Sequence, residues 1–205
     1  MFEKTATNPN ARIAQAVALF HQEAPEVSLH LHVGTIAMIE RGVMSGQFQL
    51  GIVPEHRRSE SLVYDELFDE SMGLYAGRGH PWFRAKSQTL GWKDLREQRL
   101  AALGFHSPNM MLAHQHHLER QATASDQEAV ATFVLSGRFV GFLPNHYAES
   151  FLRTGRMRAV APETLHYRCG FSCMHRRAPS LPRAPEEFRV ALVSAHSRSD
   201  TTTRS

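Results

Sequence analysis

The 205-residue sequence lacks the features that mark exported, membrane-spanning or disulfide-bonded proteins. It has only two cysteines, Cys169 and Cys173, and in an extended strand this spacing is too long for a disulfide. We therefore expect buried, reduced thiols, which are typical of the cytoplasm. The first residues show no apolar stretch of a signal peptide, and no apolar run approaches the roughly 18 residues of a membrane span. A cytoplasmic protein is the expectation.

The sequence also lacks an excess of charge of one sign. The 23 Lys and Arg residues are dispersed along the chain and nearly balanced by 20 acidic residues, which leaves a formal net charge of +3. Proteins that track nucleic-acid phosphates usually carry a basic stripe or patch. None is visible in the sequence, so we do not expect this chain itself to contact DNA.

Motifs of catalysis and cofactor binding are absent as well. The sequence contains no G-x-S-x-G nucleophile elbow, no phosphate-binding G-x-x-x-x-G-K-[ST] loop, and no G-x-G-x-x-G after a strand. His114 and His117 lie one helical turn apart and could share a metal ion, but the neighbouring Glu119 and Arg120 favour a solvated helix face. We predict no catalytic residue, no cofactor and no metal site.

What the sequence does contain is an alternation of strand-like and helix-like segments, which is typical of α/β proteins. An amphipathic helix is predicted over 11–24, a strand over 27–33, and a second helix over 36–45 that Gly46 ends. Further strands or extended stretches are predicted at 49–53, 62–77, 100–105, 140–143, 157–160 and 166–175, and further helices at 89–97, 110–119, 127–136, 146–153 and 185–195. The polar tail 196–205 is predicted to be disordered.

Several of these segments carry a family resemblance. Residues 47–53 (QFQLGIV) resemble the "G-x-x-D-hydrophobic-G-hydrophobic" strand of LysR-type regulators, and residues 134–144 (VLSGRFVGFLP) resemble their "V-x-x-G-x-G-hydrophobic-x-x-L-P". Similar blocks follow the family order at 62–67, 74–81 and 155–160. The sequence departs from the pattern at Gln49, where the family has Asp, and at Phe139, where a second Gly is expected. The chain resembles the effector-binding domain of this family.

The resemblance implies a two-lobed, periplasmic-binding-protein-like (type II) α/β fold. Lobe I is expected at residues 1–67 and 170–205, lobe II at 68–169, with two extended segments crossing between the lobes. The N-terminal winged helix-turn-helix of full-length regulators is missing from this chain, so DNA is expected as a partner only through that absent domain. Members of the family pair as homodimers or tetramers, and here the strand 30–33 and the helix from Ile36 are expected to face lobe II of the partner.

The expected ligand site lies between the lobes. Ligands of open α/β sheets bind beyond the carboxyl ends of strands, where helix N-termini favour an anion such as a carboxylate. The resemblance and this local chemistry agree on the predicted effector contacts, which are Thr5, Thr7, Gly34 and Thr35 in lobe I and Phe105, His106, Ser107 and Ser125 in lobe II. As alternatives, Thr35 and Ser125 cap helices, and Phe105 packs in the core. Asp126 is predicted to cap its helix.

The sequence therefore predicts a sensor domain that binds a small carboxylate-bearing molecule and controls transcription through the absent helix-turn-helix. Two alternatives stay open. One is a solute-binding protein of a transport system, and the other is an enzyme on the same fold that uses dispersed residues. The coding sequence upstream separates the first two, because a helix-turn-helix indicates a regulator and a signal peptide indicates a transport protein.

Overall fold

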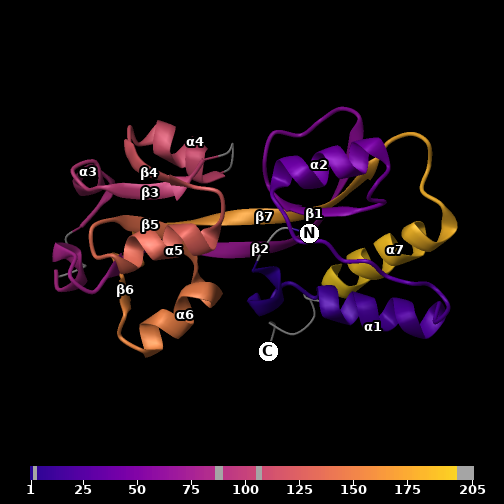
Figure 1. Cartoon of the computed structure of the whole chain (residues 1–205), viewed down its shortest axis with the longest axis horizontal. Coiled ribbons are helices and arrows are strands. Elements are labelled where there is room, and N and C mark those ends of the chain that lie inside the picture. The colour runs from indigo at the N-terminus through magenta and orange to yellow at the C-terminus, as the bar shows by residue number, and fades with distance from the viewer. Residues whose placement is uncertain (2–3, 86–89, 105–107, 198–205) are drawn as a thin grey trace, which may run out of the picture. The chain divides into compact units, whose positions relative to one another are not determined.

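The computed structural model describes residues 1, 4–85, 90–104 and 108–197, apart from the side chains of 108–110. The chain divides into two compact units (Figure 1). Unit 1 comprises Met1–Asp69 and Gly170–Ser205, and unit 2 comprises Glu70–Cys169. Strands β2 (Leu62–Gly77) and β7 (His166–Arg176) each run from one unit into the other.

Unit 1 combines helices with the outer ends of β2 and β7. Its own elements are η1 (Thr5–Thr7), α1 (Ile13–Glu23), α2 (Ile36–Ser45), β1 (Gly51–Pro54) and α7 (Arg183–Ser197). Strand β1 pairs antiparallel with β7, with Ile52 opposite Cys173. Helices α1 and α7 pack together, and the ring of Phe20 meets that of Phe188 edge-on at 5.3 Å. Helices α1 and α7, which are far apart in the sequence, therefore stabilise each other.

Unit 2 is built around a mixed sheet. Its elements are η2 (Pro81–Phe83), α3 (Trp92–Leu95), β3 (Leu100–Leu103), α4 (Pro108–Gln115), β4 (Arg120–Ala124), α5 (Gln127–Leu135), β5 (Val140–Pro144), α6 (Asn145–Arg153) and β6 (Met157–Ala159). Strand β5 and the short β6 both pair antiparallel with β2, while β3 pairs parallel with β5 and β4. The predicted α/β class is confirmed.

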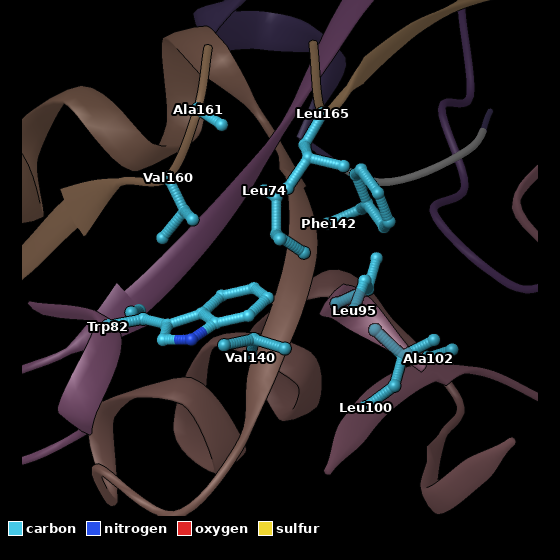
Figure 2. Close-up of a cluster of buried hydrophobic side chains, with 11 residues drawn as sticks. Leu74, Trp82, Leu95, Leu100, Ala102, Val140, Phe142, Val160, Ala161 and Leu165 are labelled. Atoms are coloured by element: carbon cyan, nitrogen blue, oxygen red, sulfur yellow. The ribbon is translucent and has the colours of Figure 1, made fainter. Parts of the chain in front are cut away.

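Both faces of the unit 2 sheet are covered by apolar side chains. Successive residues of a strand point to opposite faces, so Leu74 and Phe142 belong to one buried cluster while their neighbours Tyr75 and Leu143 belong to another. Figure 2 shows the first cluster, in which the indole of Trp82 points in between Leu74 and Val140. Each fully buried large side chain of this kind stabilises the fold by about 1.5–3 kcal/mol.

Local signals set the ends of several helices as the sequence predicts. Asp126 accepts a hydrogen bond from the amide of Ala129 at 2.8 Å, so its predicted role as the N-cap of α5 is confirmed. Gly46 ends α2 with φ 81°, and Gly137 follows α5 with φ 70°. Phe139, in the position of the family's second glycine, is not among the described residues with a left-handed backbone, and its ring packs on Phe133 at 5.4 Å.

The prediction of a strand over 27–33 is wrong. This segment forms no strand pairing in the described part of the chain. Leu29, Leu31 and Val33 are 42%, 57% and 56% exposed. Their alternation with polar residues is typical of a strand, but an alternating pattern becomes a strand only where a neighbouring strand is available. The apolar face of this segment is left exposed by the residues that the structure describes.

Other differences concern weak local signals. Strand β4 was not predicted, because its sequence (RQATA) contains no large apolar residue. Helix α4 was predicted to reach Glu119, yet it ends at Gln115, and His117 adopts a left-handed backbone with φ 53°. Helix α3 is shorter than the predicted 89–97, of which residue 89 lies outside the described ranges. The predicted disordered tail begins too early, because His196 is buried within α7.

Candidate functional site

Thr5 is the most unusual of the predicted contact residues. It is the first residue of η1 and only 1% exposed. Its Oγ1 is buried and has no hydrogen-bond partner among the described residues. A buried hydroxyl without a partner costs about 1–3 kcal/mol. Such a group in a folded protein needs an explanation, and a ligand that accepts or donates a hydrogen bond supplies one.

The residues around Thr5 hold this segment in a tight turn. Lys4 has a left-handed backbone (φ 59°), and the hydroxyl of the exposed Thr7 donates to its carbonyl at 3.1 Å. Asn8 is buried and accepts from the amide of Asn10 at 2.9 Å. Sequence analysis did not single out Asn8, although an Asn-Pro pair after two threonines is a turn signal. The hydroxyl of Thr7 is thus engaged in the turn, in contrast to that of Thr5.

Gly34 and Thr35 form the start of α2. Thr35 is exposed and caps the helix, since its Oγ1 accepts from the amide of Met38 at 3.3 Å. The capping alternative considered for Thr35 is therefore confirmed. The amide of Gly34 donates to the carbonyl of Met1 at 3.2 Å, and the amino group of Met1 donates to His32 at 2.8 Å. Met1 is thus hydrogen-bonded to the segment that leads into α2.

The start of α2 has the electrostatics of an anion site. The first amides of any α-helix have no partner within the helix, and the helix dipole places a partial positive charge there. The first turn of α2 contains no acidic residue that would compete for those amides. A carboxylate approaching Gly34 and Thr35 would therefore be favoured, while the Thr35 hydroxyl can still donate to it.

The predicted contacts of lobe II are described only in part. Phe105, His106 and Ser107 lie outside the described residues. Ser125 lies between β4 and α5, is exposed, and donates to Oδ2 of Asp126 at 3.1 Å. This is the carboxyl end of a parallel strand, where ligands of α/β proteins bind. The Asp126 carboxylate beside it disfavours a second anion at that position.

Unit 2 also contains buried polar groups that sequence analysis missed. Glu70 and His146 are almost fully buried and form a pair with 2.7 Å between Oε1 and Nε2. Beside it, the hydroxyl of Tyr75 donates to Asn145 at 2.8 Å, and burial raises the pKa of Tyr75 to about 12. Both contacts join β2 to the first residues of α6. The only local signal in the sequence for the start of α6 was the Leu-Pro pair that ends the preceding strand.

A cavity of about 570 Å³ lies elsewhere in unit 2, where α4 gives way to β4. It is lined by Ala113, His114, His117, Leu118, Glu119 and Arg120. None of the predicted contacts that the structure describes, which are Thr5, Thr7, Gly34, Thr35 and Ser125, lines it. Among the described residues, no group of three or more His, Cys, Asp or Glu side chains is placed to hold a metal ion.

The two cysteines are both buried and unbridged, as predicted. Burial raises the pKa of the Cys173 thiol to about 12, with a smaller contribution of the same sign from the charge of Asp65. A thiol that stays protonated is a poor nucleophile. In the described part of the chain, no helix is long and apolar enough to cross a membrane.

Comparisons with known proteins agree with this architecture. The family model of the LysR substrate binding domain matches residues 5–196 of this chain. The HTH-type transcriptional activator BauR of Pseudomonas aeruginosa is 32% identical over 187 residues, which cover 91% of this chain and 61% of BauR. The chain therefore spans less than two thirds of that relative.

Solved structures are similar in fold at low sequence identity. The CcmR regulatory domain of Synechocystis PCC6803 in complex with 2-PG superposes with a TM-score of 0.73 at 17% identity, covering 93% of this chain and 94% of that chain. A reduced form of OxyR from N. meningitidis gives a TM-score of 0.69 at 16% identity, covering 92% and 91%. These neighbours confirm the periplasmic-binding-protein-like fold class expected from the resemblance.

Proposed function

The chain belongs to the family of LysR substrate-binding domains, and on that premise we propose that it senses a small carboxylate-bearing molecule for a DNA-binding transcriptional regulator. One observation carries the proposal. The buried Thr5 hydroxyl has no partner among the described residues, and it lies in the segment that follows the Met1 contact with Gly34. A ligand carboxylate held by the first amides of α2 would bring an acceptor into this region.

In this proposal the two units act as lobes, with Thr5, Thr7, Gly34 and Thr35 contacting the ligand from lobe I. Ser125 of unit 2, which follows strand β4, stays a predicted contact, and residues 105–107 lie outside the described residues. Ligand binding changes the balance between lobe or subunit arrangements, which requires different affinities for the two states. The regulator that carries this domain transmits the change to DNA.

A thermal-shift screen of small organic acids tests the proposal. A ligand that binds only the folded state raises the unfolding midpoint. At a hundredfold excess of ligand over Kd, the free energy of unfolding rises by about 2.7 kcal/mol. We expect one or more carboxylic acids to raise the midpoint, while the matching amides and alcohols leave it unchanged. A response to cations or neutral sugars with none to acids would contradict the carboxylate assignment.

We also propose that the domain self-associates through the exposed segment 27–33 and helix α2. Leu31, Val33 and Met44 are all more than half exposed, and apolar surface of this kind is typical of protein interfaces. Leu31→Asp should shift the chain from dimer to monomer in sedimentation equilibrium. Leu152→Asp, on the exposed face of α6, is the matched control and should leave the dimer intact. A wild-type chain that is monomeric at all concentrations would contradict this part of the proposal.

The transport alternative makes a different prediction about the gene. A helix-turn-helix encoded directly upstream supports the regulator, whereas a signal peptide there would contradict it. The relative BauR, by its name an HTH-type activator, favours the regulator.

A further inference from the structure

One end of unit 2 is strongly basic. Three segments that are far apart in the sequence, 76–85, 135–141 and 151–160, contain several arginines and no aspartate or glutamate. All of these arginines are exposed. They are Arg78, Arg84, Arg138, Arg153, Arg156 and Arg158. We call this set the basic end of unit 2. Its six positive charges exceed the formal net charge of +3 of the whole chain.

Hydrogen bonds and close backbone packing show that the three segments come together in space. The guanidinium of Arg78 donates to the carbonyl of Gly155 from both Nε (3.2 Å) and Nη2 (2.9 Å). Its amide donates to the carbonyl of Arg156 at 3.0 Å, beyond the paired ends of β2 and β6. A Cβ added to Gly137 would lie 2.6 Å from the carbonyl oxygen of Arg78, so the turn before Arg138 is packed on the same residue.

The remaining arginines are held near this group. Arg158 donates to the carbonyl of Phe83 at 3.1 Å, which places it beside Arg84. The guanidinium of Arg156 lies over the ring of Phe151, 5.4 Å from its centre, two residues before Arg153. The basic end therefore has a defined arrangement, and its long side chains are partly ordered by contacts with the chain.

The basic end also lacks internal compensation. Within the described residues, none of its six arginines forms an ion pair with a carboxylate. Arg189 in unit 1 shows the usual arrangement, since it pairs with Glu186 at 2.6 Å and with Asp65 at 3.1 Å. Six like charges gathered without ion pairs to carboxylates repel one another in the free domain, so a polyanionic partner would gain by covering them.

We propose that the basic end of unit 2 binds the phosphate backbone of duplex DNA. Guanidinium groups match phosphate geometry, and contacts of this type are independent of base sequence. DNA is favoured over an acidic protein because the family regulates transcription and its relative BauR is named for a helix-turn-helix. The effector domain would then add affinity for DNA flanking the site that a helix-turn-helix reads. Sequence analysis did not predict this surface, since its basic residues gather only on folding.

The 205-residue chain itself can be used for the test, because the substrate-binding domain accounts for residues 5–196. Fluorescence anisotropy with a short labelled duplex of mixed sequence measures binding as salt is varied. Each neutralised phosphate contributes about −0.9 to the slope of log K against log salt, so six contacts give a slope of about −5. We expect micromolar binding at low salt that is lost at physiological salt, and equal affinity for unrelated sequences.

A matched pair of double variants locates the surface. Arg138→Glu/Arg153→Glu changes two exposed arginines of the basic end, while Arg57→Glu/Arg183→Glu makes the same charge change in unit 1. The first variant should weaken binding at least about tenfold and make the salt slope less steep by about 2. The second should weaken binding less than about twofold. Circular dichroism checks that both variants fold.

Three outcomes overturn the proposal. The first is that the wild-type chain shows no salt-dependent DNA binding. The second is that both variants lose affinity equally, which would indicate an effect of net charge. The third is that the chain binds a polyglutamate peptide through the basic end but not DNA, which would assign the surface to an acidic protein.

Discussion

Two threonines of unit 1 look alike in the sequence but differ in the structure. Thr5 and Thr35 both lie at the start of a helical element after a turn. Thr35 is exposed, and its hydroxyl caps α2. Thr5 is buried, and its hydroxyl has no partner among the described residues. The first hydroxyl stabilises the free domain while the second destabilises it, so only Thr5 is in a state that a ligand would improve.

The largest expected effect follows from removing the Thr5 hydroxyl. Thr5→Val keeps the shape of the side chain but removes the unsatisfied group. The free domain should gain about 1 kcal/mol of stability, while the affinity for the acid found by screening should fall about 10–100-fold. Thermal unfolding and calorimetry measure the two quantities. Loss of stability with unchanged affinity would show that Thr5 is a structural residue with no role in the site.

Next in size is the cap of α5 in unit 2. Asp126 accepts a short hydrogen bond from Ala129 as a charged cap, so Asp126→Ala should cost about 1–2 kcal/mol and lower the midpoint by about 2–8 °C. Ser125→Ala is the control and should change stability by less than about 0.5 kcal/mol, because Ser125 is exposed. Equal losses in both variants would mean that the serine shares the capping role.

A smaller loss is expected at Thr35. Its capping bond is long at 3.3 Å, so Thr35→Ala should cost about 0.5–1 kcal/mol, in the opposite direction to Thr5→Val. Thr35→Ser retains the hydroxyl and should restore both stability and ligand affinity. If Thr35→Ala stabilised the domain as Thr5→Val does, the contrast between the two threonines would be lost.

The smallest effect concerns the start of α1. Here the imidazole of His196 accepts a hydrogen bond from a backbone amide, as the hydroxyl of Thr35 does at the start of α2. The amide of Arg12 donates to Nε2 of His196 at 3.0 Å, while Nδ1 donates to the carbonyl of Leu192 at 2.7 Å, which fixes a neutral tautomer. Burial, the largest cause, lowers the pKa of His196 below its ordinary 6.5, and the charge of Arg12 adds to this.

Because the unfolded chain binds this proton more readily, the contribution of His196 is complete above pH 6.5 and is lost as the pH falls below it. Urea unfolding at several pH values between 5 and 8 should show a shallower acid-side decline for His196→Gln than for the wild type. Identical pH profiles would mean that His196 does not link folding to proton binding.

Helix ends and fold class could be predicted from the sequence because their signals are local. Thr35, Gly46 and Asp126 act within four residues of their own position, and alternation of strands and helices indicates α/β architecture. The burial of Thr5 could not be predicted, since burial is set by the tertiary fold and the neighbouring residues carry no signal for it. The basic end of unit 2 could not be predicted either, because its arginines come together only in the folded chain.

The uncovered segment 27–33 shows a different limit of prediction. Its alternating pattern is real, but the sequence does not say whether the strand that completes it belongs to the same chain. In the described structure no such strand is present, and Leu29 and Leu31 remain exposed. The prediction was wrong about secondary structure while the apolar face it identified is present.

An amide-resolved NMR titration tests whether a carboxylate binds at the start of α2 and at Thr5. The domain, labelled with ¹⁵N, is titrated with the acid that gives the largest thermal shift. We expect the largest chemical-shift changes at Thr5 and at the amides of 34–37. Changes confined to the cavity of His114 and His117, with those amides unmoved, would contradict it.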